Sequence, residues 1–261
     1  MSLGFLTRKG RHWTTAWVIG ASSGIGRELA LLLSEQGSYV AASARSADKL
    51  KDLAEQAHKI GGYPLDVTDP ESVKSSAADI EEASGPIDLV VLCAGAWTIS
   101  DVAKIDVPAI RKGVEVNYMG AVHVLDAILP GMLARRQGHI VIVASVAGYR
   151  GLPRSLAYGP TKAALINLAE TLNAELAPHG VKVSLVNPGF VDTALTRDNP
   201  FPMPAIMSAN AAAKKLLAGL KSERYEIIFP RRFVYPMKLL RIVPNVVFFW
   251  IIRKFVLKPP A

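Results

Sequence analysis

The sequence contains a single cysteine, Cys93, among its 261 residues. One cysteine excludes an intrachain disulfide and a multi-cysteine zinc cluster, and it fits a reducing compartment. The five histidines share no metal-ligand spacing, and neither H-E-x-x-H nor a nucleophile-elbow motif occurs. We therefore expect no metal site, and we interpret His123, which lies in an apolar helical stretch, as a core residue rather than a ligand.

Long hydrophobic runs are also missing. The longest uninterrupted apolar stretch, residues 246–252, has seven residues, whereas a membrane-spanning helix needs about 20. The N-terminal segment 1–13 is basic but lacks an apolar core of signal-peptide length. The sequence therefore predicts no spanning helix and a cytoplasmic protein.

Acidic residues are absent from both ends of the chain. Residues 1–11 carry +3 and residues 231–258 carry +7, against a net charge of +8, so the remainder carries −2. A nucleic-acid-binding protein more often has a basic face on its folded body, and we expect no nucleic-acid partner. Basic ends beside apolar residues suit peripheral contact with an anionic membrane surface, or they serve solubility alone.

Buried-strand patterns and amphipathic helical patterns alternate through most of the chain. Strands that are apolar on both faces and separated by helices predict a parallel sheet covered on both sides. The fold class is therefore α/β, a Rossmann-type doubly wound sheet of about seven strands in one domain, residues 14–229. Strands are expected at 15–20, 39–44, 63–66, 87–93, 139–145, 181–187 and 225–229, with helices at 25–36, 47–59, 70–83, 108–136 and 157–177.

A glycine-rich loop follows the first expected strand and opens the first helix. Its glycines permit a tight turn and close approach of the backbone to a pyrophosphate, and the helix N-terminus supplies free N–H groups. The spacing is G-x-x-x-G-x-G rather than the commonest dinucleotide pattern. The cofactor-binding residues expected here are Gly20, Ser22, Ser23, Gly24, Ile25 and Gly26.

At this spacing the sequence resembles the short-chain dehydrogenase/reductase family, and the resemblance runs from about residue 14 to 229. It implies that Asp66 and Val67 bind adenine and that the loop with Ala94 and Gly95 lines the cofactor site. Asp66 could equally cap the next turn, and the two roles are compatible. The resemblance also implies that residues 188–193 hold the nicotinamide carboxamide, through Pro188, Gly189, Val191 and Thr193. The sequence departs from the family pattern at Ile19, which replaces a Thr, and at Cys93, which replaces an Asn; we interpret this pair as a repacked contact between two loops.

The end of the second strand distinguishes the two nicotinamide cofactors. An acid there accepts the ribose hydroxyls of NAD, whereas a 2′-phosphate attracts Arg. The strand ends Ser43-Ala44-Arg45, with no acid until Asp48. We predict NADP(H), with Arg45 on the 2′-phosphate and Arg27 either a second cation or solvent-facing.

A Y-x-x-x-K motif places Tyr158 and Lys162 on one face of a predicted helix. A nearby ammonium favours the phenolate, and a phenol must have its pKa lowered to act near neutral pH. Ser145 and Asn117 complete the family's catalytic set. The resemblance implies that Ser145 positions the substrate oxygen, Tyr158 transfers the proton, Lys162 lowers the Tyr158 pKa and holds the nicotinamide ribose, and Asn117 orders a water.

These features predict an NADP(H)-dependent oxidoreductase that interconverts a carbonyl and an alcohol. The alternative is a non-catalytic NADP(H)-binding regulatory or scaffold protein. Residues 196–207 carry three prolines with Phe and Met side chains, which suggests a lipophilic small-molecule substrate or simple packing under the tail. The resemblance further implies a homodimer or homotetramer.

The C-terminal tail, residues 230–261, is apolar and basic. Pro236 and Pro244 should divide it into short pieces, with Asn245 capping a helix that runs to about Val256. Three roles remain open: covering the substrate cleft, packing in a homo-oligomer interface, or lying in a membrane interface.

Overall fold

The buried apolar runs form one parallel sheet. In the computed structural model, which describes residues 12–197 and 199–257, seven strands pair in the order β3-β2-β1-β4-β5-β6-β9. The strands are β1 (Thr15–Ile19), β2 (Tyr39–Ala44), β3 (Ile60–Pro64), β4 (Leu89–Leu92), β5 (Gly138–Val143), β6 (Val181–Pro188) and β9 (Glu226–Phe229). The predicted α/β class and strand count are confirmed. Two further short strands, β7 (Val191–Asp192) and β8 (Met207–Ser208), pair with each other outside this sheet.

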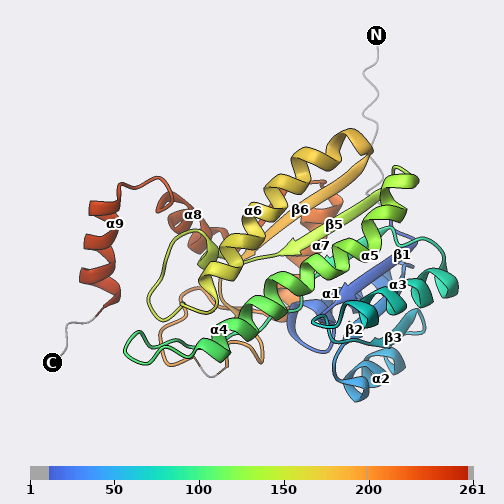
Figure 1. Cartoon of the computed structure of the whole chain (residues 1–261), viewed down its shortest axis with the longest axis horizontal. Coiled ribbons are helices and arrows are strands. Elements are labelled where there is room, and N and C mark those ends of the chain that lie inside the picture. Colours follow the sequence, from blue (N-terminus) through green and yellow to red (C-terminus); the bar gives the residue numbers. More distant parts are fainter. Residues whose placement is uncertain (1–11, 198, 258–261) are drawn as a thin grey trace, which may run out of the picture.

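Helices cover both faces of the sheet, as the burial of β1, β4 and β5 along their whole length requires. One apolar core lies against α3 (Pro70–Ser84), α5 (Gly120–Ala134) and α6 (Gly159–Leu176), the helices in front of the sheet in Figure 1. A second core lies against α1 (Gly24–Glu35), α2 (Ala47–Glu55) and α7 (Ala209–Lys221). The carboxyl ends of the parallel strands are thereby left free for a ligand.

Two elements have different bounds in the structure from those expected. The third strand begins at Ile60 rather than at residue 63, and α2 ends at Glu55 rather than at residue 59. Gly61 and Gly62 therefore do not mark the end of a helix but lie inside β3. A Cβ on Gly61 would overlap the hydroxyl of Tyr39 on β2, so close side-chain approach accounts for that glycine.

The helix expected over residues 108–136 is one continuous rod with a widened turn. It comprises α4 (Val107–Val114), a π-helical turn (Glu115–Met119) and α5. Among the described residues, 107–134 is the one stretch long and apolar enough to cross a membrane by composition. Val124, Ile128 and Met132 of this stretch are buried in the core against the sheet, so its apolar character serves packing.

The tail forms two helices, α8 (Arg231–Leu239) and α9 (Asn245–Ile251), and α9 continues as a π-helical turn (Ile252–Val256). The expectation that Pro236 divides the tail is wrong, since Pro236 lies within α8. The predicted helix after Pro244 is present, but Asn245 is its first residue rather than its cap. The Asn245 side chain instead accepts a hydrogen bond from Arg150, 2.8 Å away.

Candidate functional site

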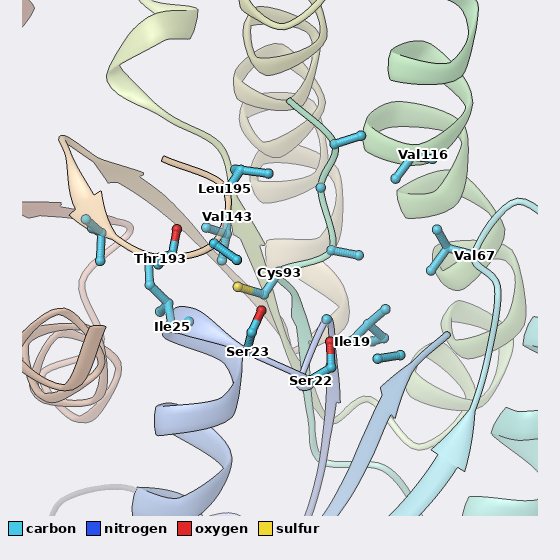
Figure 2. Close-up of a pocket in the computed structure, with 18 of the residues that line it drawn as sticks. Ile19, Ser22, Ser23, Ile25, Val67, Cys93, Val116, Val143, Thr193 and Leu195 are labelled. Atoms are coloured by element: carbon cyan, nitrogen blue, oxygen red, sulfur yellow. The ribbon is translucent and has the colours of Figure 1, made fainter. Parts of the chain in front are cut away.

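A cavity of about 520 Å³ opens at the carboxyl ends of β1, β2, β4, β5 and β6. Its walls are the glycine loop, the ends of these strands, the start of α6 and residues 188–196 (Figure 2). Every site residue predicted from the sequence lines this cavity except Gly26 and Asn117. The structure thus brings residues from seven separate stretches of the chain into one site.

The glycine loop has a conformation that other residues would not tolerate. Gly20 and Gly24 have φ values of +92° and +60°, and a Cβ on Gly20 would lie 2.6 Å from the Ala94 nitrogen. A Cβ on Gly24 would lie 2.9 Å from Thr193 Cγ2, and one on Gly26 would overlap the Gly20 carbonyl. Ser23 precedes α1 without capping it through its side chain. The first N–H groups of α1 are therefore available to a phosphate, and the loop fits a dinucleotide.

The two departures from the family pattern meet between adjacent loops. The Cys93 N–H donates to the Ile19 carbonyl at 2.9 Å, and the Gly26 N–H faces the Cys93 sulfur. Burial raises the pKa of the Cys93 thiol to about 11, so the thiol stays neutral at ordinary pH. Figure 2 shows the Cys93 side chain beside Ser23 of the glycine loop. Backbone hydrogen bonding and sulfur packing join these loops, which agrees with a repacked contact.

Two cations border the cavity near the end of β2. Arg45 and Lys49 are exposed lining residues one helical turn apart, and Asp66 lines the same region. The Thr68 backbone N–H, at 3.0 Å, is the main cause that lowers the pKa of Asp66, with a smaller contribution from Arg45. Arg27 does not line the cavity. Its guanidinium donates to Gln56 Oε1 at 2.8 Å and pairs with Glu28. Of the two roles expected for Arg27, these contacts favour the surface position over a second cation at the cofactor.

The residues predicted to be catalytic meet where β5 ends and α6 begins. Tyr158 precedes the first turn of α6, and Lys162 lies one turn later with its side chain buried. The Lys162 ammonium donates to the Val143 carbonyl at 2.9 Å and lies 5.4 Å from the Tyr158 ring centroid. Ser145 follows β5, and its hydroxyl is hydrogen-bonded with that of Tyr158.

Burial dominates the ionisation of this pair. It raises the pKa of Tyr158 to about 12, although the hydrogen bond with Ser145 acts in the opposite direction. It also lowers the pKa of Lys162 to about 8. We expected Lys162 to lower the pKa of Tyr158. In the structure the pKa of Tyr158 is raised instead, so this expectation is wrong. Tyr158 is held protonated, as a proton donor must be, while Lys162 changes charge near neutral pH.

Asn117 was expected to order a water molecule. In the structure its side chain contacts protein groups on two sides. It lies in the π-helical turn, where its Oδ1 accepts from the Ala96 N–H at 2.6 Å. Its Nδ2 donates to the Ala96 carbonyl and to Thr161 Oγ1, both at 3.0 Å. The buried Asn117 side chain thus joins the loop after β4 to the first turn of α6. Tyr158 directly precedes this turn, and Lys162 lies in it.

Sequence reasoning missed Trp97, which lies beside Tyr158, and Asn199, which contacts Trp97. The Trp97 ring meets the Tyr158 ring edge-on, with centroids 4.9 Å apart, and its indole N–H donates to Asn199 Oδ1 at 2.8 Å. Lys49 was missed as well. The signals available were weak: Trp97 comes two residues after Gly95, and Lys49 lies four residues after Arg45.

Aromatic side chains link the segment after β6 to the tail. Phe190 contacts Phe201 of the loop and Phe233 of α8, with centroids 6.2 and 5.3 Å apart. A Cβ on Gly189 would lie 2.7 Å from Phe233, so α8 closes directly over this segment. Part of the loop therefore does pack under the tail, while Asn199 connects it to the site.

The described residues contain no group of three or more His, Cys, Asp or Glu side chains placed to hold a metal ion. His123 is half-buried, and its Nδ1 lies 2.9 Å from the Val67 carbonyl oxygen. This contact joins α5 to the loop after β3 and gives the histidine a structural partner.

Comparison with known proteins identifies the family. Residues 14–201 match the family model described as short chain dehydrogenase. The chain belongs to this family. It is 35% identical over 240 residues to an uncharacterised oxidoreductase of Myxococcus xanthus (strain DK1622), a match that covers 90% of this chain and 95% of that one. An uncharacterised oxidoreductase of Staphylococcus aureus (strain N315) is 37% identical over 183 residues, which cover 69% of this chain and 79% of the relative.

Solved structures of short-chain dehydrogenases have the same fold. One from Burkholderia cenocepacia J2315, in complex with NADP, has a TM-score of 0.80 at 28% identity and covers 94% of this chain and 98% of its own. One from Burkholderia phymatum, in complex with NAD, has a TM-score of 0.81 at 22% identity over 95% of this chain and 98% of its own. The chain is thus an oxidoreductase of this family, with a nucleotide-binding Rossmann-type domain.

Proposed function

We propose that this short-chain dehydrogenase is an NADP(H)-dependent enzyme that interconverts a carbonyl and an alcohol on a lipophilic small molecule. The observation that carries the proposal is one cavity with two complementary ends. A glycine cradle with Arg45 and Lys49 lies at one end, and Ser145, Tyr158 and Lys162 lie at the other. The site is thus suited to hold an extended dinucleotide beside an acid–base group.

The side chains at the second end can complete a reduction. A nicotinamide cofactor bound along the glycine loop would supply the hydride for the carbonyl carbon. The Ser145 hydroxyl orients the carbonyl oxygen, and the protonated Tyr158 donates its proton to that oxygen as the alcohol forms. The Lys162 ammonium, 5.4 Å from the Tyr158 ring, then stabilises the phenolate until solvent returns the proton. Alcohol oxidation uses the same steps in reverse.

The preference for NADP(H) rests on charge at the β2 end of the cavity. Arg45 and Lys49 supply two cations where a 2′-phosphate would lie, and the remaining acid nearby, Asp66, is engaged by Thr68. A guanidinium binds phosphate through charge-assisted hydrogen bonds. The Burkholderia cenocepacia relative in complex with NADP is consistent with this assignment.

The lipophilic substrate is inferred from the rim of the cavity. Leu195 lines the cavity and is 39% exposed. Ile99, two residues after Trp97, and Ile206, which follows Met203 in the loop of Asn199, are 41% and 42% exposed. Trp97 adds a large apolar surface beside Tyr158. Apolar side chains around a few polar groups are typical of sites for apolar ligands.

The decisive experiment measures NADPH oxidation with aldehydes and ketones of increasing chain length, using wild-type protein and Tyr158→Phe. We expect turnover that rises with apolar length and is lost in Tyr158→Phe, with NADPH binding retained. Tyr235→Phe, which alters an exposed tyrosine of α8, serves as the matched control and should retain full turnover. Oxidation of the matching alcohols with NADP⁺ tests the reverse direction.

A non-catalytic NADP(H)-binding regulator is the competing proposal, favoured only by the altered pair Ile19 and Cys93. It requires tight NADPH binding, no turnover in either direction, and a biological activity that Tyr158→Phe leaves unchanged. A homodimer or homotetramer and a cytoplasmic location remain predictions. Light scattering on the purified protein and fractionation of cells test them.

A further inference from the structure

Helix α9 and the π-helical turn after it form an arm that stands apart from the sheet (Figure 1). Phe248 and Ile252, one turn apart, are its buried side chains. At 100° per residue, the opposite side of the helix carries Val246, Trp250 and Arg253. Val246 is 82% exposed and Trp250 is 53% exposed. We call this outward side the arm face, which consists of Val246, Phe249, Trp250, Arg253 and Lys254.

The side chain of Arg150 connects the arm to the rest of the protein. The Arg150 guanidinium lies 4.1 Å over the Phe248 ring and donates to Asn245 Oδ1 at 2.8 Å. It also donates to the Val243 and Arg241 carbonyls at 3.3 and 3.4 Å. The arm is therefore fixed in direction by polar contacts, and its apolar arm face is not consumed by the core. A contiguous exposed patch of this kind marks a binding surface.

The positive charge of the tail favours an anionic partner. Residues 231–257 carry six cations and no acid. Lys238 pairs with Glu226, and Arg241 with Glu170. Within the described part of the chain the other four, Arg231, Arg232, Arg253 and Lys254, form no ion pair with a carboxylate. Lys254 Nζ lies 4.9 Å from the Trp250 ring centroid, so cation and aromatic are adjacent on the arm face.

We propose that the arm face docks on the surface of a bilayer rich in anionic phospholipid, with the arm lying in the interface. Val246, Phe249 and Trp250 would enter the headgroup boundary, while Arg253 and Lys254 extend to the lipid phosphates. A symmetric contact with a second copy is disfavoured, because it would place these same cations against themselves. The apolar side chains distinguish the arm face from a purely electrostatic phosphate site.

The arm lies on the side of the molecule where substrate would enter. In Figure 1, α8 and α9 lie on the side to which the arrow of β5 points, and the cavity opens at the carboxyl ends of the strands. Docking through the arm face would bring the rim of the cavity toward the bilayer. This last step rests on the proposed function: a lipophilic carbonyl or alcohol dissolved in the bilayer would reach Tyr158 without crossing bulk water.

Flotation of the full-length protein with phosphatidylcholine vesicles, with and without phosphatidylglycerol, tests the proposal. We expect the protein to float with the anionic vesicles and not with the neutral ones. The double variant Arg253→Glu/Lys254→Glu should lower the partition coefficient at least about tenfold, since each cation near an anionic surface contributes about 1 kcal/mol. Phe249→Ser/Trp250→Ser should lower it comparably. Leu133→Ser, at an exposed apolar position on α5, is the matched control and should float like wild type.

Three results would overturn the proposal: no flotation of the full-length protein, equal flotation with neutral vesicles, or undiminished flotation of both arm variants. If light scattering instead shows a dimer that Trp250→Ser dissociates, the arm face is an interface between copies. NADPH oxidation with short, water-soluble aldehydes should be unchanged in every variant. If wild type itself fails to turn over, the proposed function fails while flotation still reports on the arm face.

Discussion

Trp97 meets Tyr158 edge-on at 4.9 Å while its indole N–H is held by Asn199. The loop after β4 and the loop around residue 199 therefore both act on the tyrosine that would transfer the proton. Edge-to-face aromatic pairs contribute about 0.5–1.5 kcal/mol beyond burial. Trp97 is thus a positioning residue for Tyr158, and Asn199 positions Trp97.

The first prediction concerns this relay. Asn199→Ala should lower kcat/KM for carbonyl reduction about threefold to tenfold, because Trp97 loses its hydrogen bond and Tyr158 loses a fixed neighbour. The Kd for NADPH, measured by fluorescence, should stay constant. Trp97→Phe should show a similar loss, and the double variant should lose little more than either single one. Strictly additive losses would contradict the relay.

The second prediction concerns cofactor choice. Arg45→Asp should weaken NADPH binding about tenfold to a hundredfold, since a charged hydrogen bond contributes about 1.5–3 kcal/mol, and should reverse the preference toward NADH. Lys49→Ala should weaken NADPH binding less and leave NADH binding unchanged. Arg27→Ala is the control, because that guanidinium contacts Glu28 and Gln56. An unchanged NADPH preference in Arg45→Asp would exclude Arg45 from the 2′-phosphate site.

The third prediction is a pH dependence. Burial lowers the pKa of Lys162 to about 8, so the side chain is charged below that pH and neutral above it. If the ammonium holds the nicotinamide ribose, the Kd for NADPH should rise as the pH passes upward through about 8. In Lys162→Met the affinity should be lower, with no inflection there. A wild-type Kd that stays constant between pH 7 and pH 9 would contradict this role.

The fourth prediction concerns how the tail is anchored to the sheet. Glu226 of β9 accepts hydrogen bonds from Tyr149 at 2.7 Å and Asn187 at 3.0 Å, and pairs with Lys238 of α8. Burial acts to raise the pKa of Glu226, but these three partners outweigh it, so the pKa is lowered. The stabilisation is therefore present above the ordinary pKa, 4.5, and is lost as the pH falls through the lower folded value.

Glu226→Gln should accordingly lower the melting temperature at pH 7, by an amount equivalent to about 1–3 kcal/mol. The gap from wild type should narrow as the pH falls below 4.5, because wild type then loses the same charge. Glu170→Gln, which removes a surface pair with Arg241 at 4.0 Å, is the control and should cost less than about 1 kcal/mol. A gap that stays constant down to pH 3 would show that Glu226 stabilises the fold without its charge.

The regular parts of the fold were predictable because most strands, such as β1, β4 and β5, are buried on both faces. The glycine loop, Tyr158 and Lys162 were predictable because their spacing is local along the chain. The start of β3 was not predictable, because Gly61 and Gly62 resemble the end of a helix in the sequence. Only the structure shows that the Tyr39 side chain packs against Gly61. Propensity and turn signals carry no information about such a cross-strand contact.

Two of the missed residues, Trp97 and Asn199, share one cause. Trp97 and Asn199 are 102 positions apart, and only the folded chain places the indole N–H on the amide oxygen. The ionisation of Tyr158 was misjudged for a related reason. A motif shows that Lys162 is near, but the desolvation that outweighs it depends on everything packed around the site.

The close fit of Phe233 on Gly189 bears on whether the tail can be exchanged between relatives. A side chain at position 189 would force the Phe233 ring of α8 to move, so the packing of the tail depends on the residue at this position. A chimera that carries residues 230–261 needs a glycine at this position of its new host. The segment that contains Gly189 and the tail thus form one packed unit, and a change in either requires a matching change in the other.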